Sequence, residues 1–264
     1  MAAVDEGRFS TGQPYLKLGQ GPPLFVLPGL TSEHANPKGR WRKLSLSWAA
    51  AFAEHFTVYL AQRRPGLPVG ASLADIAADY AGAIEKDVGA PVAVHGTSSG
   101  GSVALSLAIN HPQLVTRMVV AAAACRLSPK GKDVQAELAR LTEAGEPRKV
   151  GAFLLSEMSP GPLKLPARAA GWLAGSLMKA DDPSDMLVVI AAEDVFDAEP
   201  ELGRITAPTL VLGGDRDPFY SEELFRQTAA GIPNGEVVIF PGKSHMYAAG
   251  SKVPAGIGLG FLLS

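Results

Sequence analysis

The chain has 264 residues, of which 47% are hydrophobic and 19% are charged, and its formal net charge is −2. This composition is typical of a globular protein with a large core, and the near-zero charge gives no reason to expect a nucleic-acid partner. The single cysteine, Cys125, excludes an intramolecular disulfide and a cysteine metal cluster.

The N-terminal residues MAAVDEGRFS contain neither a basic nor an apolar signal region, so no secretory signal is expected. No apolar stretch approaches the roughly 18 residues that cross a bilayer, and we expect a cytoplasmic protein without a membrane contact. The dipeptide Arg63-Arg64 and the group Arg40, Arg42 and Lys43 are expected to be solvated charges. The sequence leaves a homodimer open.

Short apolar, β-branched runs alternate along the chain with longer helical patterns. In chain order, the sequence predicts a strand at 22–29, a helix at 40–56, a strand at 56–62, a helix at 72–89, a strand at 91–96, a helix at 99–112, a strand at 115–124, a strand at 207–214, a helix at 221–232 and a strand at 236–242. Ser72 suits an N-cap and Gly89 a C-cap. The alternation predicts an α/β fold with a mainly parallel sheet and helices on both faces.

The span between the predicted strands at 115–124 and 207–214 shows only helical patterns. They cover 130–145, 148–158, 166–180 and 183–196, and prolines and glycines separate them. We therefore expect a core formed by residues 1–125 and 201–264, and a helical cap insertion at 126–200 over one end of the sheet.

The segment VAVHGTSSGGSVAL (92–105) places Ser98 where a predicted strand turns into a predicted helix. It contains the pattern G-x-S-x-G, with Gly96 and Gly100 two residues on either side of the serine. A sharp strand-to-helix turn is crowded, so side chains at those two positions would collide with the neighbouring strand and helix. The start of the following helix also favours negative charge beside the serine. Ser98 is thus a candidate nucleophile.

A serine nucleophile needs a base and an acid that orients the base, and both are expected at later strand ends. His245 follows the last predicted strand, in a loop that can hang over the sheet edge. Asp215 and Asp217 both follow the strand 207–214; we assign the acid to Asp217, because Asp215 lies closer to the strand and suits a turn cap. The other histidines are expected to be structural, with His34 the best placed of them to face a pocket.

At this point the chain resembles the α/β-hydrolase superfamily, in its serine-nucleophile branch of esterases and haloperoxidase-like enzymes. The resemblance rests on LPGL at 27–30, GTSSGG at 96–101, GGDRDP at 213–218 and KSHM at 243–246. It implies an eight-stranded sheet with a helical cap, the triad Ser98, Asp217 and His245, and an oxyanion hole made by the backbone N–H groups of Ser99 and Leu30.

Two motifs depart from the family pattern. Many relatives have His-Gly where this chain has Pro28-Gly29, so the loop lacks the usual support of a histidine ring. The segment QRRPGL (62–67) lacks the common acidic residue at its start.

These features predict a serine hydrolase that cleaves a carboxylic ester or thioester of a small or medium apolar substrate through an acyl-enzyme, with no metal and no organic cofactor. Met158 and Trp172 of the cap, with His34, are candidates for the substrate pocket. Two alternatives stay open. The same triad serves perhydrolases, carbon–carbon bond hydrolases, lyases and acyltransferases, and the fold also allows a ligand-binding protein without catalysis.

Overall fold

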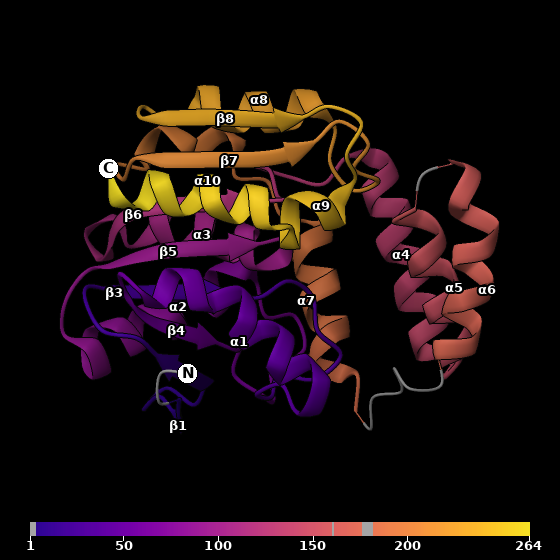
Figure 1. Cartoon of the computed structure of the whole chain (residues 1–264), viewed down its shortest axis with the longest axis horizontal. Helices are drawn as coiled ribbons and strands as arrows, with labels where there is room; N and C mark the ends of the chain where they lie inside the picture. Colours follow the sequence, from indigo (N-terminus) through magenta and orange to yellow (C-terminus); the bar gives the residue numbers. More distant parts are fainter. Residues whose placement is uncertain (1–3, 160, 176–181) are drawn as a thin grey trace.

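An eight-stranded sheet forms the centre of the protein in the computed structural model, which describes residues 4–159, 161–175 and 182–264. Its strands are β1 (Asp5–Arg8), β2 (Pro14–Leu18), β3 (Pro23–Leu27), β4 (Thr57–Ala61), β5 (Val92–Thr97), β6 (Val115–Ala121), β7 (Thr209–Gly214) and β8 (Gly235–Phe240). They lie in the order β1-β2-β4-β3-β5-β6-β7-β8 (Figure 1). Only the pairs β1–β2 and β2–β4 are antiparallel, so the predicted mainly parallel sheet is confirmed.

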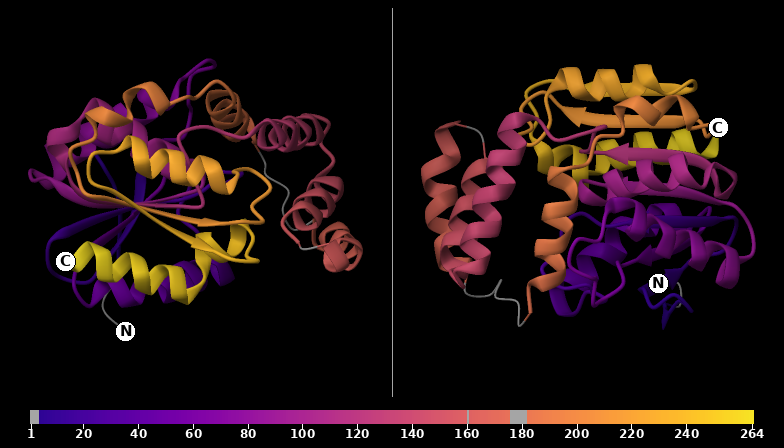
Figure 2. Two further views of the ribbon diagram at one scale, coloured as in Figure 1. Left: turned by 90° about the horizontal axis from the view of Figure 1, so that it is seen from above. Right: turned by 180° about the vertical axis from the view of Figure 1, so that it is seen from behind.

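Helices cover both faces of the sheet, as Figure 2 shows for α8 and α10 on opposite sides. Those of the core are α1 (Gly39–Ala53), α2 (Leu73–Ala83), α3 (Ser99–Asn110), α8 (Glu222–Gly231), α9 (His245–Gly250) and α10 (Lys252–Leu263). α2, α3 and α8 contribute buried residues to one apolar cluster, and α1, α9 and α10 to another. This is the α/β-hydrolase arrangement that the sequence predicts.

The strand β3 shows why the sheet needs cover on both sides. Phe25 and Leu27 belong to the first cluster, whereas Leu24 and Val26 belong to the second, and all four are buried. Since successive side chains of a strand point to opposite faces, a continuous apolar run is what a parallel strand between two helical layers requires.

The chain termini carry the main differences from the predicted elements. The antiparallel strands β1 and β2 lie before residue 22, in a segment for which the sequence predicts no strand. The helix α10 follows the last predicted strand and is also absent from the predicted elements. The predicted helix 72–89 divides into α2 and a π-helical turn at Ile84–Val88, which ends at Gly89 with φ of 71°. Ser72 caps α2 as predicted, because its side chain accepts a hydrogen bond from the N–H of Asp75.

In the described part of residues 126–200, the range predicted as a cap, the α-helices are α4 (Pro129–Glu143), α5 (Pro147–Glu157), α6 (Lys164–Ala174) and α7 (Ser184–Asp194). They lie beyond the carboxyl ends of the parallel strands, on the side to which the β7 arrow points in Figure 1. Asp185 of α7 accepts hydrogen bonds from the N–H groups of Gly66 and Leu67, which ties α7 to the loop after β4. Within the described ranges, no helix is both long and apolar enough to span a membrane.

A buried histidine in β5 leads to a prediction about stability. His95 is 1% exposed, lies edge-on to Trp48 and Phe52, and its Nδ1 has no hydrogen-bond partner among the described residues. Burial lowers the pKa of His95 to about 4. The unfolded chain therefore binds more protons than the folded one between pH 6.5 and 4, and folding loses free energy as the pH falls through that window.

When the pH falls from 7 to 4, we expect the buried His95 to lower the free energy of unfolding by about 3 kcal/mol. The measurement is urea unfolding at both pH values, for the wild type and for His95→Phe, which keeps an aromatic ring between Trp48 and Phe52. On the same change of pH, the free energy of unfolding of His95→Phe should fall by about 3 kcal/mol less than that of the wild type. An equal loss in both proteins would contradict the assignment.

Candidate active site

Ser98 lies at the sharp turn between β5 and α3, with φ of 51° and ψ of −126°. This left-handed φ is uncommon outside glycine and strains the backbone. The turn is held by a hydrogen bond from the Ser98 N–H to Ala121 O at 2.9 Å. A Cβ on Gly96 would lie 2.5 Å from Gly100 O, and a Cβ on Gly100 would lie 2.3 Å from Leu27 O. Both glycines are thus required for the close approach that the motif predicts.

Replacing Gly100 with alanine is expected to destabilise the fold by about 3 kcal/mol, because the new methyl group overlaps two backbone carbonyls that cannot move independently. The measurement is the free energy of unfolding in urea. Gly256→Ala is the matched control, since a Cβ there meets nothing within 4 Å and α10 gains helix propensity. Equal stability of Gly100→Ala and the wild type would contradict this description of the turn.

The two candidate acids, Asp215 and Asp217, have different environments after β7. Asp217 Oδ1 accepts hydrogen bonds from the N–H groups of Phe219 at 2.8 Å and Tyr220 at 3.2 Å, which leaves Oδ2 to face His245. Asp215 Oδ1 instead accepts from the N–H of Gly242 at 2.7 Å and secures the turn after β8. The structure therefore brings Asp217, and not Asp215, to the histidine.

His245 is the first residue of α9, and not part of an open loop as the sequence suggests. Its Nδ1 lies 2.7 Å from Asp217 Oδ2 and its Nε2 lies 3.1 Å from Ser98 Oγ. The chain before α9 reaches this position because Gly214, at the end of β7, has no side chain: a Cβ there would lie 2.2 Å from Lys243 O. Three segments far apart in the sequence thus meet in one chain of hydrogen bonds.

The Asp217–His245 pair is shielded from water. The side chain of Asp217 has no exposed surface, and that of His245 is 5% exposed. The rings of Phe219 and Tyr220 flank the imidazole, with centroids 4.8 Å and 6.3 Å from its centre. Low local polarity strengthens the hydrogen bond between the carboxylate and the imidazole N–H, which fixes the ring orientation.

The predicted oxyanion donors, Leu30 and Ser99, lie on segments that flank Ser98. Ser99 is fully buried and is the first residue of α3, so its N–H has no acceptor within the helix. Leu30 follows Gly29, whose backbone lies against Ser98: a Cβ on Gly29 would be 3.3 Å from Ser98 Cβ. The two segments approach the serine from the ends of β3 and β5, which are neighbours in the sheet.

Arg63 lies against the loop after β3 and contacts Ser99, and the sequence predicts no role for it there. The sequence predicts that Arg63 is solvated together with Arg64, but Arg63 is 1% exposed, so that prediction is wrong. It donates to the carbonyl oxygens of Pro28 and Gly29, at 3.0 Å and 2.8 Å, because it lies two residues beyond the end of β4 and β4 pairs with β3. The only sequence signal was the departure at QRRPGL.

His34 lies behind this arginine. It is 3% exposed, its Nε2 accepts from Arg63 Nε at 3.1 Å, and its Nδ1 lies 3.1 Å from Arg64 O. Burial, with the charge of Arg63, lowers the pKa of His34 to about 4, so the ring is neutral and Nε2 stays an acceptor. Both ring nitrogens therefore contact protein atoms, and neither is placed to bind a substrate.

A buried carboxylate connects α7 and α4 to α3, and no sequence motif indicates it. Glu193 of α7 is 2% exposed and accepts hydrogen bonds from Ser102 of α3 at 3.0 Å and Gln135 of α4 at 2.9 Å. Burial raises the pKa of Glu193. The contact fixes two cap helices against α3 one turn beyond Ser98.

The two predicted cap residues occupy different environments. Met158 is half-buried and packs against the first apolar cluster, whereas Trp172 is 47% exposed beneath the guanidinium of Arg148. Trp172 lines a cavity of about 610 Å³ between α4, α5 and α6, and neither Met158 nor a triad residue lines that cavity. The structure therefore does not bring Met158, Trp172 and His34 together in one pocket.

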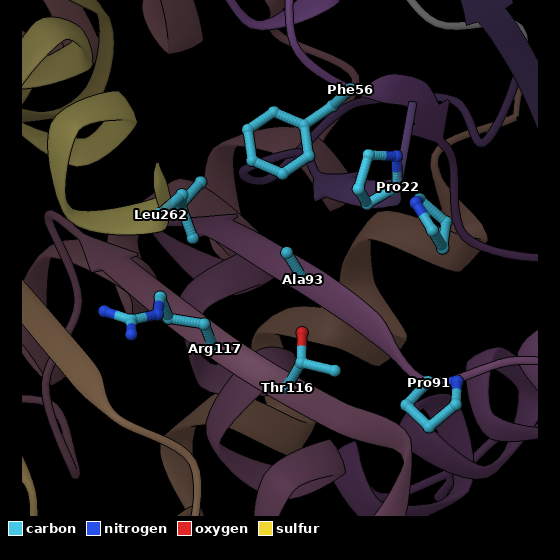
Figure 3. Close-up of a pocket in the computed structure, with 8 residues that line it drawn as sticks. Pro22, Phe56, Pro91, Ala93, Thr116, Arg117 and Leu262 are labelled. Atoms are coloured by element: carbon cyan, nitrogen blue, oxygen red, sulfur yellow. The ribbon is translucent and has the colours of Figure 1, made fainter. Parts of the chain in front are cut away.

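A second cavity, of about 220 Å³, lies at the amino ends of β3, β5 and β6, where Figure 3 shows Pro22, Ala93, Thr116 and Leu262 around it. Ser98 follows the carboxyl end of β5, so this cavity lies at the other end of the strands from Ser98. Across the described ranges, no group of three or more His, Cys, Asp or Glu side chains is arranged to hold a metal ion.

Comparisons with known proteins agree with the fold. Among solved structures, the chain is similar to an alpha/beta hydrolase enzyme from a Medee basin deep-sea metagenome library, with a TM-score of 0.80, 18% identity, and coverage of 96% of this chain and 95% of that one. It is also similar to the enol-lactonase of Burkholderia xenovorans LB400, with a TM-score of 0.78, 19% identity, and coverage of 98% and 100%.

A third similar structure is the esterase EaEST of Exiguobacterium antarcticum, with a TM-score of 0.73, 18% identity, and full coverage of both chains. At these identities the likeness shows a shared fold. The sequence profile of the Alpha/beta hydrolase family matches residues 24–251, which contain Ser98, Asp217 and His245. The protein thus belongs to the alpha/beta hydrolase family.

Proposed function

We propose that the protein is a serine hydrolase that cleaves a carboxylic ester or thioester of a small or medium apolar substrate. The observation that carries the proposal is the continuous hydrogen-bonded series Asp217 Oδ2, His245 Nδ1 and Nε2, and Ser98 Oγ, with separations of 2.7 Å and 3.1 Å. Nucleophile, base and orienting acid within hydrogen-bond reach are the requirement for acyl transfer. Similarity to an esterase and an enol-lactonase agrees with this choice of bond.

In the first half of the reaction, Ser98 Oγ attacks the substrate carbonyl carbon while its proton moves to His245 Nε2. The carbonyl oxygen becomes an oxyanion, which the N–H groups of Ser99 and Leu30 stabilise; one such donor is typically worth about 3 kcal/mol in the barrier. Asp217 holds the Nδ1–H tautomer and stabilises the imidazolium. The tetrahedral intermediate then collapses, and His245 protonates the departing alkoxide or thiolate.

In the second half, water replaces the leaving group. His245 Nε2 takes a proton from the water as its oxygen attacks the acyl carbon, and a second oxyanion forms in the same hole. Collapse of this intermediate breaks the bond to Ser98 Oγ, which regains its proton from the imidazolium, and the carboxylic acid leaves. The helices α4 to α7 lie beyond the same strand ends, and we propose that apolar side chains of this cap, Met158 among them, contact the acyl chain.

The test is a steady-state assay with p-nitrophenyl acetate, butyrate and octanoate and with the matching acyl thioesters. We expect turnover of at least one ester with saturation kinetics, and loss of that turnover after treatment with a fluorophosphonate. Parallel assays with a diketone and with hydrogen peroxide plus a carboxylic acid distinguish carbon–carbon cleavage and perhydrolysis. Turnover of only these last substrates, or of none, would contradict the proposal.

A further inference from the structure

A buried arginine lies against the loop of the proposed oxyanion hole, and no carboxylate in the described part of the chain forms a hydrogen bond with it. Arg63 is 1% exposed, and all the hydrogen bonds of its side chain within the described ranges go to neutral groups. A guanidinium keeps its charge in proteins, and burying that charge is costly unless it is well hydrogen-bonded. A fold that keeps such a group beside its active serine therefore points to a role for it.

The donors of Arg63 converge on one loop. Nη2 donates to Gly29 O at 2.8 Å and to Thr31 Oγ1 at 3.2 Å, and Nη1 donates to Pro28 O at 3.0 Å. Nη1 also lies 3.4 Å from Ser99 Oγ, and Nε donates to His34 Nε2 at 3.1 Å. All three guanidinium nitrogens are therefore engaged by protein atoms, so Arg63 is not available to bind a substrate anion.

The bond to Gly29 O acts directly on a proposed oxyanion donor. The carbonyl of Gly29 and the N–H of Leu30 belong to the same peptide group, which is planar and trans, since the described chain has no cis peptide bond. In a trans peptide the C=O and N–H bonds point in opposite directions. Fixing Gly29 O against Arg63 thus directs the Leu30 N–H away from the arginine, and a charged donor on the carbonyl also polarises the N–H.

We propose that Arg63 is a positioning residue for the oxyanion hole: it orients and polarises the Gly29–Leu30 peptide, and through Ser99 Oγ it contacts the segment that carries the second donor. The inference rests on the proposed function, because it concerns the oxyanion of that reaction. The effect of Arg63 should fall on the transition state, in which negative charge develops on the carbonyl oxygen, and much less on the bound ester.

The first test compares steady-state kinetics of the wild type, Arg63→Met and Arg63→Lys on the best p-nitrophenyl ester. Arg63→Met should lower kcat about 10²-fold with KM within threefold, which is the effect of losing one oxyanion donor. Arg63→Lys keeps a charged donor without the planar fork and should recover part of kcat. Arg64→Met is the matched control, since Arg64 makes an ion pair with Asp79 at the surface, and it should behave as the wild type.

The second test separates positioning from general damage to the fold. An alkyl trifluoromethyl ketone with the acyl chain of the ester forms a hemiketal with Ser98 Oγ, whose oxyanion occupies the hole, whereas the product carboxylate forms no such bond. Across the four proteins, the inhibition constant of the ketone should rise in parallel with the loss of kcat/KM, and that of the product should stay constant. Far-ultraviolet circular dichroism shows which variants are folded. If Arg63→Met does not fold, the kinetic and inhibition constants of Arg63→Lys alone test the inference.

Three results would overturn the inference: an unchanged kcat in Arg63→Lys and Arg63→Met, an increase in KM alone, or equal weakening of the ketone and the product. These outcomes differ from failure of the proposed function, in which the wild type itself neither hydrolyses the esters nor binds the ketone.

Discussion

Replacing Ser98 with alanine should lower kcat for the best activated ester by roughly 10⁴- to 10⁶-fold. The substitution removes only the hydroxyl group, whose oxygen lies 3.1 Å from His245 Nε2, so the decrease in kcat reports the loss of nucleophilic attack. Ser98 already carries a Cβ at φ of 51°, so alanine adds no backbone strain and the fold should persist. The measurement is steady-state turnover together with thermal unfolding.

Ser106→Ala is the matched control for this variant, because Ser106 is a buried serine farther along α3 whose hydroxyl contacts Asn110. It should keep kcat within about twofold of the wild type, in line with a substitution that touches no reacting group. If Ser98→Ala were folded and nearly as active as the wild type, Ser98 would not be the nucleophile.

Asp217→Asn should lower kcat by about 10⁴-fold with little change in KM. The backbone N–H groups of Phe219 and Tyr220 occupy Oδ1, so the asparagine carbonyl should take that position and its NH₂ should face His245. The NH₂ donates to Nδ1 and stabilises the tautomer with the proton on Nε2. In that tautomer Nε2 already carries a proton and cannot accept the proton of Ser98, although the hydrogen bonds of residue 217 to Phe219, Tyr220 and His245 are kept.

Asp215→Asn separates this effect from the general loss of a carboxylate after β7. Among the described residues, the Asp215 carboxylate accepts one hydrogen bond, from the N–H of Gly242, and an asparagine carbonyl can replace it there. We expect kcat within about threefold of the wild type, as for other substitutions away from the reacting groups. Equal losses in the two variants would show that the acid is not Asp217.

Sequence periodicity locates the buried parallel strands well, because each is a short continuous apolar run between helical patterns. It misses β1, whose residues DEGR are mostly exposed and show no apolar alternation. It also misses α10, in which three glycines, Gly256, Gly258 and Gly260, lower the helix propensity. Packing of α10 against β6 through buried residues such as Leu262 compensates for that propensity, and a local pattern does not contain this information.

The three residues of the proposed triad are predictable because each follows a strand in a recognisable motif, and the structure brings all three side chains together. The arginine that supports the oxyanion loop is not predictable, because its partners are backbone carbonyls and a neutral histidine, which leave no charge pattern in the sequence. The resemblance to the family indicates only that Pro28 stands where many relatives have a histidine that supports the loop. Which side chain takes over that support depends on the pairing of β3 with β4.

Covalent labelling with an alkyl fluorophosphonate tests the central claim most directly, because phosphonylation needs a serine oxygen that a neighbouring base activates. Intact-mass and peptide-mass measurements on the folded protein should show one phosphonyl group for each chain, attached to the peptide that contains Ser98, and none on Ser98→Ala. An unlabelled folded wild type, or a label on any other residue, would contradict the account.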